Sequence, residues 1–287
     1  MKQGPDFFNS LPEGCISCII STTSPREACR SSAVSPAFRA ASESDFVWER
    51  FLPTDYSDIL SRAVAPPEYA SKKELYFALC DSILIDDGKK VFWLEKSTGK
   101  KRYMLSAAEI AITWGNGLTP QYWDRVDFPE SRFGQVAELF SVCWLEIKGK
   151  FESGFLSHKT TYAVYLILKF RGENYGLDHT PAEMKVKLGD QQSVHRARLR
   201  DSSSPRSPHP RPRRRLLPWR TAFFEENPHT VPRLRGDGWM ELEMGQFFND
   251  DGREGEVEFS LLNTSGHWKK GLIVDGVEIR PAQAQQV

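Results

Sequence analysis

The sequence predicts an α+β chain of more than one domain, with a small helical domain at the N-terminus followed by an antiparallel β-sandwich. Three observations predict this class. Residues 11–52 carry apolar side chains at helical spacing, separated by proline steps. From Lys89 onward, the apolar period changes from 3.6 residues to 2. The length of 287 residues suffices for two domains, and the 40% of hydrophobic residues supply their cores.

Short helices are expected between residues 11 and 52. Ser24-Pro25 and Ser35-Pro36 each place a good N-cap before a proline at the first helical position. Asp45 is expected to cap a last short helix. Four apolar side chains share one face of the first helix: Cys15, Ile16, Ile19 and Ile20. Residues 55–88 then form a helical connector, in which Ser71 begins a helix.

The strands are predicted from short segments rich in β-branched and aromatic residues. Their apolar positions alternate with polar neighbours, as in the half-buried strands of a sandwich: Met184, Val186 and Leu188; Met240, Leu242 and Met244; Val257, Phe259 and Leu261. Asp275-Gly276 predicts a two-residue hairpin turn. Ser106-Ala107-Ala108-Glu109 matches a capping box and predicts one short helix.

An Arg/Pro-rich segment at residues 193–235 interrupts the strand pattern. Between residues 193 and 220 there are nine Arg and one Asp, and five prolines lie between residues 205 and 218. Because proline removes backbone donors and like charges repel, we expect neither a central strand nor a stable helix. The segment is either a disordered basic loop, with residues 211–215 as a nuclear import signal, or an artefact of the sequence. We favour the artefact, since the pattern resumes at Asp237.

The charge and cysteine content argue against several functions. The chain is formally neutral, so the excess of eight positive charges in residues 193–220 (nine Arg less one Asp) leaves eight negative charges for the remainder. This balance argues against specific nucleic-acid binding. No stretch approaches the roughly 20 apolar residues of a membrane span, and an odd number of cysteines, five, leaves no complete pairing. We expect a reduced compartment, the cytoplasm or the nucleus.

No catalytic constellation is visible in the sequence. The six histidines lack metal-ligand spacing, and P-loop, dinucleotide and nucleophile-elbow motifs are absent. Cys15 and Cys18 have the spacing of a metal pair but lack a second pair, so we interpret both thiols as packing. We therefore expect a protein that is not an enzyme and that needs no cofactor and no metal.

The stretch LPEGCISCIISTTSPREACRSSAVSPAFRAASESDFVWERFLP resembles the F-box, which places this domain at residues 7–54. The resemblance implies an apolar surface that docks to the Skp-type adaptor of cullin-RING ubiquitin ligases. The docking residues that it implies are Leu11, Pro12, Ile16, Ile19, Ile20 and Phe38, whereas Trp48 is expected to pack the domain. The alternative is a helical bundle that packs only on its own protein.

Most of residues 89–282 falls into blocks that carry a second resemblance: KKVFWLEKSTGKKRYMLSAAEIAITWGN, YWDRVDFPESRFGQVAELFSVCWLEIKGKF, LSHKTTYAVYLILKF, YGLDHTPAEMKVKLGD and DGWMELEMGQFFNDDGREGEVEFSLLNTSGHWKKGLIVDGVEIRP. This domain resembles the phloem protein 2 family, the plant lectin domain also found in the tobacco agglutinin. The resemblance implies a lectin-like β-sandwich that binds N-acetylglucosamine oligomers or the core of N-glycans. The F-box ahead of it points to the F-box group of that family.

Sugar binding needs aromatic rings against the C–H faces of the sugar and polar groups for its hydroxyls. Trp114 and Trp123, around the loop of residues 115–117, are the candidate stacking residues, with Asn116 as a hydroxyl partner. The alternative is that both tryptophans belong to the core. Four further tryptophans lie in or beside strand patterns and are expected to be structural: Trp93, Trp144, Trp239 and Trp268.

These features together predict the substrate-recognition subunit of a Skp-cullin-F-box ubiquitin ligase, whose lectin-like domain holds a glycan or a glycoprotein target. Its contribution to catalysis is proximity, because an F-box subunit carries no reactive group. Two alternatives stay open. One is a receptor whose β-domain binds a protein surface without sugar, and the other is a free nucleocytoplasmic lectin.

Overall fold

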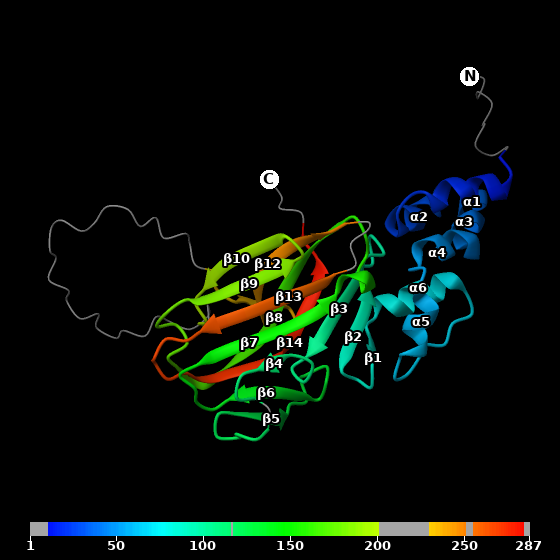
Figure 1. Cartoon of the computed structure of the whole chain (residues 1–287). Helices are drawn as coiled ribbons and strands as arrows, with labels where there is room; N and C mark the ends of the chain where they lie inside the picture. The colour runs from blue at the N-terminus through cyan, green and yellow to red at the C-terminus, as the bar shows by residue number, and fades with distance from the viewer. Residues whose placement is uncertain (1–10, 116, 201–229, 251–254, 284–287) are drawn as a thin grey trace, which may run out of the picture.

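The computed structural model describes residues 11–115, 117–200, 230–250 and 255–283. It shows a group of helices at the N-terminus beside a sandwich of two antiparallel sheets (Figure 1). The predicted class, helices followed by a β-sandwich, is therefore what the described residues form. Within them, no helix is long and apolar enough to cross a bilayer.

Among the residues that the structure describes, six α-helices precede the sheets: α1 (Glu13–Ser21), α2 (Pro25–Ser31), α3 (Pro36–Glu43), α4 (Asp45–Phe51), α5 (Tyr56–Ser61) and α6 (Lys72–Cys80). The hydroxyls of Ser24, Ser35 and Ser71 cap α2, α3 and α6, as the sequence predicts. The predicted cap at Asp45 is wrong, because Ser44 accepts the backbone N–H of Phe46 and Asp45 is already helical.

One apolar core runs from the helices into the sandwich. Trp48 is fully buried, donates its indole N–H to the carbonyl of Ser42 at 2.7 Å and lies 5.2 Å from the Tyr76 ring. Tyr76 belongs to α6, whose Leu75 and Leu79 are also buried, and α6 packs on both α4 and strand β2 (Lys90–Leu94). The connector therefore joins the two parts through packed side chains.

The larger sheet has nine strands among the described residues. Seven follow one another across it in the order β1 (Ile83–Ile85), β2, β3 (Lys101–Ser106), β14 (Lys270–Pro281), β8 (Thr160–Tyr175), β12 (Met240–Asn249) and β11 (Arg233–Leu234). The other two are β5 (Trp123–Asp127) and β6 (Gln135–Leu139), of which β6 pairs with β14. The sheet begins at Ile83, six residues before the change of period at Lys89.

The smaller sheet has five strands among the described residues, in the order β10 (Gln191–Ala197), β9 (Ala182–Leu188), β13 (Glu256–Asn263), β7 (Leu145–Glu152) and β4 (Ala111–Ile112). A 3-10 helix, η2 (Ser153–Phe155), follows β7. The predicted alternation is confirmed, because Met184, Val186 and Leu188 are buried while their polar neighbours are not. The main core lies between the two sheets, and a second buried cluster on the nine-stranded sheet includes Trp93, Tyr165 and Ile273.

The predicted hairpin at Asp275-Gly276 is wrong, since both residues lie inside the continuous strand β14. Asp275 is the extra residue of a β-bulge, where Val274 pairs with Leu168 and Gly276 pairs with Ile167. A Cβ on Gly276 would lie 1.9 Å from the carbonyl oxygen of Leu105, so glycine permits this close approach to β3. The Asp-Gly pair thus encodes a bulge.

Two further expectations need revision. Ser106–Glu109 forms a turn that leads toward β4, with the N–H of Glu109 bonded to the carbonyl of Ser106, and no helix begins there. The Arg/Pro-rich segment begins as a regular strand, because residues 193–197 complete β10 at the edge of the smaller sheet. Its other end contributes β11. Residues 201–229, where we predicted disorder or an artefact, lie outside the described residues.

Candidate functional sites

Trp114 follows β4 and is held in an uncommon backbone conformation. Its φ is 67°, in the left-handed region, which a bulky residue adopts only at a cost of about 1–3 kcal/mol. The Thr119 hydroxyl donates to the carbonyl of Trp114 at 2.7 Å and fixes this turn. The indole is nevertheless 51% exposed. Backbone strain at an exposed aromatic residue makes Trp114 a candidate binding residue.

Polar and aromatic groups surround Trp114. The Tyr122 ring lies 5.9 Å away in an edge-to-face arrangement. The Glu146 carboxylate accepts the Thr113 hydroxyl at 2.7 Å and the indole N–H of Trp144 at 3.3 Å. Hydrogen bonds from Lys148 and then from Thr113 lower the pKa of Glu146. Glu146 is therefore a charged acceptor bonded to Trp144 and to the residue before Trp114, and Trp144 is 48% exposed.

A buried lysine fixes the segments that carry the exposed tryptophans. Lys269 is fully buried, and its ammonium donates to the carbonyls of Cys143, Ser265 and His267 at 2.8–3.0 Å. Its backbone also pairs in both directions with Val142. Burial lowers the pKa of Lys269. Lys269 thus ties the residue before Trp144 to the turn that carries Trp268, which is half-exposed.

The candidate stacking pair is not confirmed as a pair. Trp123 is 1% exposed within β5, where it pairs with Leu139, so its ring packs in the core and does not reach a ligand. This corrects its predicted role, because the chain turns Trp123 inward. Asn116 lies outside the described residues.

Sequence reasoning missed Tyr122, Trp144 and Glu146. Burial of Leu145 and Ile147 in β7 places Trp144 and Glu146 on the opposite, solvent face. That alternation was readable in the sequence, whereas the approach of Tyr122 to Trp114 depends on a tertiary contact. We name Trp114, Tyr122, Trp144, Glu146 and Thr113 the aromatic site. It offers rings for the C–H faces of a sugar and a carboxylate for hydroxyls.

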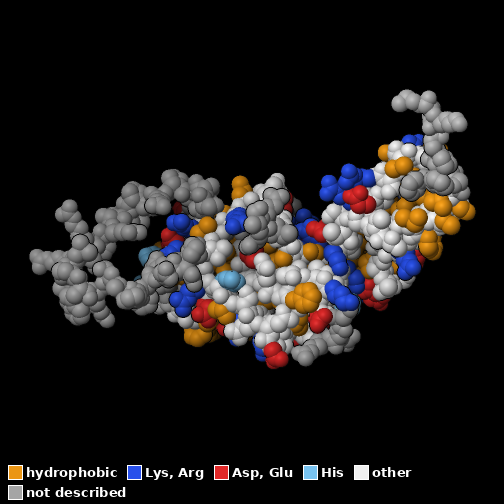
Figure 2. Space-filling model, turned by 90° about the horizontal axis from the view of Figure 1, so that it is seen from above, with side chains coloured by type: hydrophobic (Ala, Val, Ile, Leu, Met, Phe, Trp, Pro, Cys, Tyr) orange, Lys and Arg blue, Asp and Glu red, His pale blue; other side chains and the backbone are white. Residues whose placement is uncertain are grey.

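The predicted adaptor-docking residues divide into two groups. Leu11, Pro12 and Ile19 are exposed, with Ile19 53% exposed, and Phe38 is half-buried. Ile16 and Ile20 are 0% and 2% exposed, so the structure corrects their docking role: both form the core of the helices. Figure 2 shows apolar side chains gathered on the helical domain at the end away from the sandwich. Other exposed apolar side chains of α1–α4 and their loops are Val34 and Phe46.

No group of three or more His, Cys, Asp or Glu side chains with metal-ligand geometry occurs in the part of the chain that the structure describes. The histidines that do meet, His179 and His267, stack at 5.2 Å between ring centroids. The described residues carry two exposed groups of non-polar side chains, an aromatic one on the sandwich and an apolar one on the helices.

Comparisons with known proteins cover both the helices and the sandwich. The family model of phloem protein 2 matches residues 100–281. An F-box protein of Arabidopsis thaliana is 46% identical over 99% of this chain and 83% of its own length. The Arabidopsis F-box proteins PP2-B1 and PP2-B10 are 41% and 43% identical, over 96% and 99% of this chain and 90% and 97% of their own.

A solved structure, the CBM22-1 xylan-binding domain of Paenibacillus barcinonensis Xyn10C, covers 63% of this chain and 86% of its own at 9% identity, but its TM-score of 0.27 supports no inference. The sequence relatives decide the assignment, since they extend through the helices as well as the sandwich. The chain therefore belongs to the phloem protein 2 family, among its F-box proteins.

Proposed function

We propose that this protein is the substrate-recognition subunit of a Skp-cullin-F-box ubiquitin ligase, and that its sandwich binds N-acetylglucosamine oligomers or N-glycans of target proteins. The observation that carries the sugar-binding part is the strained, exposed Trp114, whose neighbour in the chain, Thr113, is hydrogen-bonded to the charged Glu146. Strain of this kind persists where surrounding structure maintains it, often at ligand sites. The names of the relatives support the F-box part.

The adaptor would bind the helices through exposed apolar side chains. On binding, the exposed apolar side chains of Leu11 and Ile19 would leave solvent without breaking any polar contact of their own. A small apolar surface recognises a partner in this way. The target would bind the sandwich, and ubiquitin transfer would follow from proximity alone. We propose the cytoplasm or the nucleus as the compartment, which a fluorescent fusion in plant cells tests.

The sugar-binding part is tested with Trp114→Ala on a chitin column and a glycan array. We expect the full chain to be retained and the variant to lose retention, with an unchanged melting temperature because the ring is half-exposed. Phe248→Ala, which removes another exposed ring on β12, is the matched control and should be retained. If the unmutated protein binds neither chitin nor N-glycans, the sugar-binding proposal is wrong, and a receptor whose sandwich binds a protein surface takes its place.

The adaptor part is tested by co-purification with a Skp-type adaptor. Replacing Leu11 and Ile19 by Ala should weaken capture by about tenfold or more, since apolar anchors contribute about 1–3 kcal/mol each. Val64→Ala, at an exposed apolar residue outside α1–α4, is the control. Undiminished capture by the double variant would contradict the assignment of this surface.

A further inference from the structure

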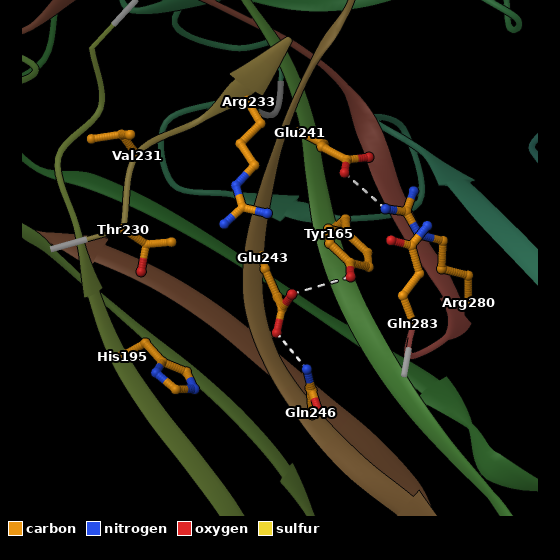
Figure 3. A pocket seen from close by; sticks show the side chains of 10 residues that line it. All are labelled: Tyr165, His195, Thr230, Val231, Arg233, Glu241, Glu243, Gln246, Arg280 and Gln283. Atoms are coloured by element: carbon orange, nitrogen blue, oxygen red, sulfur yellow. Dashed lines mark hydrogen bonds and ion pairs between the residues drawn. The ribbon is translucent and has the colours of Figure 1, made fainter. Parts of the chain in front are cut away.

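A polar pocket lies at the other edge of the sandwich, away from the aromatic site. It has a volume of about 740 Å³ and is bounded by strands of both sheets (Figure 3). Its polar lining includes Tyr165, His195, Arg233, Glu241, Glu243, Gln246 and Arg280. They come from β8, β10, β11, β12 and β14, so segments distant in sequence converge here.

A β-bulge builds the floor of this pocket. In β12, Glu243 pairs with Tyr165 and Gly245 pairs with Val164, so Met244 is an extra residue. The bulge changes the phase of the strand, and Gln246 therefore follows Glu243 on the same face. The amide of Gln246 donates to Glu243 at 2.7 Å. A regular strand would have turned Gln246 to the core.

The same bulge brings β10 close. A Cβ on Gly245 would lie 2.9 Å from the Ser193 hydroxyl and 3.0 Å from Val186, so glycine lets the two sheets approach at this edge. Ser193 in turn is hydrogen-bonded to the ring of His195 at 2.8 Å, which holds the imidazole at the wall of the pocket. Gly245 thus shapes both the floor and the wall.

The polar side chains of the pocket are oriented before any ligand arrives. The Tyr165 hydroxyl donates to Glu243 at 3.1 Å, and burial raises the pKa of Tyr165 to about 12, so the donor proton is retained. Arg280 donates to Glu241 at 2.8 Å and lies 3.7 Å above the Tyr165 ring. Side chains held in this way lose little freedom on binding, which favours affinity.

The charge of the lining indicates the class of ligand. Two guanidinium groups, Arg233 and Arg280, are matched by two carboxylates, Glu241 and Glu243, so the formal charges cancel. Within the described residues, Arg233 has no carboxylate partner and extends into the pocket (Figure 3). A neutral ligand with many hydroxyls both donates to Glu243 and accepts from Arg233, whereas a charged ligand would leave one sign unmatched.

We propose that this pocket is a second saccharide site, which binds a neutral sugar through Glu243, Gln246 and Arg233. It goes beyond the proposed function, because it does not involve the aromatic site. The pocket lies mainly on the nine-stranded sheet and borders β10 through His195, whereas the aromatic site follows β4; β10 and β4 are the two edges of the five-stranded sheet. Four strand spacings separate those edges, roughly 19 Å. One branched glycan, or two glycans, would thus engage the sandwich at two points.

The experiment uses the full chain with Trp114→Ala, so that sugar binding that depends on Trp114 is removed before this pocket is measured. Calorimetric titration employs four neutral trisaccharides: maltotriose, cellotriose, mannotriose and chitotriose. We expect at least one to bind, and Glu243→Gln to weaken it by about tenfold, because a charged acceptor is lost. Glu183→Gln, at an exposed carboxylate on β9, should leave the Kd unchanged within about twofold.

Gln246→Ala is a second test, since it alters an exposed side chain and leaves Glu243 folded against Tyr165. It should also weaken binding severalfold. Binding by none of the four sugars, or a Kd that neither variant changes, overturns the proposal. Every titration is made on a protein that lacks Trp114. Failure of the titrations therefore does not affect the chitin-column test of Trp114, and failure of the chitin-column test does not affect the titrations.

Discussion

Asp275 provides a quantitative prediction about stability. Its side chain is 1% exposed in the bulge of β14 and accepts the hydroxyl of Ser131 at 2.5 Å. Burial raises the pKa of Asp275 from 3.8 to about 6, while the Ser131 hydrogen bond and the charge of Arg132 act in the opposite direction. The protein therefore buries a carboxylate whose charged form is disfavoured by the fold.

The expected magnitude follows from the pKa difference. About two pKa units at 1.4 kcal/mol each amount to about 3 kcal/mol. Between pH of about 4 and 6, the folded state retains a proton that the unfolded chain has released, so this group lowers stability as the pH rises through that window. Above about pH 6 both states are ionised, and the cost is constant. Asp275→Asn removes the cost and keeps an oxygen for Ser131.

The assay is urea unfolding of the protein and Asp275→Asn from pH 4 to 8. We expect the variant to be more stable by up to about 3 kcal/mol at pH 7.5, and the difference to shrink toward pH 4. Taking the difference between the two proteins cancels all other titrating groups. Asp81→Asn, at an exposed carboxylate, controls for the change in net charge. A difference that is zero at pH 7.5, or equal at all pH values, would refute the reasoning.

Three other predictions concern packing and positioning. Gly276→Ala should destabilise the protein by more than about 2 kcal/mol in urea unfolding, since its Cβ meets a backbone oxygen, whereas Gly172→Ala, with open space around it, should cost little. Arg62 and Asp86 form two hydrogen bonds, at 2.8 and 2.9 Å. A double-mutant cycle measured by urea unfolding should give a coupling free energy of about 1–2 kcal/mol between them. A coupling free energy of zero would contradict a role of this pair in joining the helices to the sheet. Lys269→Met should reduce retention on chitin, because the three carbonyls that its ammonium holds would no longer fix the loops. The melting temperature of the same variant is measured as the control for folding. Unchanged retention would show that Lys269 does not position the aromatic site.

The elements were predictable where the local sequence decides them. Ser24 and Ser35 cap helices because the hydroxyl and the following proline act within one turn. The alternation around Met184 and Val186 predicted a strand because its period depends on neighbours only. In contrast, Asp275-Gly276 has the chemistry of a turn and of a bulge, and strands β3 and β8 on both sides determine which one forms.

The candidate sites were predictable only in part, because exposure depends on tertiary packing. Ile16, Ile19 and Ile20 share one helical stripe in the sequence, yet α3 and α4 cover two of them and leave Ile19 in solvent. Trp114 and Trp123 lie on either side of the same loop in the sequence. Strand β5 turns Trp123 inward, while the left-handed turn at Trp114 directs its ring outward.

The shared core of helices and sandwich has a mechanical consequence. Tyr76 of α6 reaches the carbonyls of Glu95 and Lys96 in the β2–β3 turn, and a Cβ on Gly99 would lie 3.1 Å from the carbonyl oxygen of Phe51. Such contacts allow little relative movement between the helices and the sandwich. A partner bound to α1–α4 and a ligand bound to the sandwich would therefore be held at a nearly fixed distance and orientation. Only those target residues that lie at this distance from the bound ligand would be within reach of the partner. The rigid contact between the helices and the sandwich would thus restrict which target residues are modified.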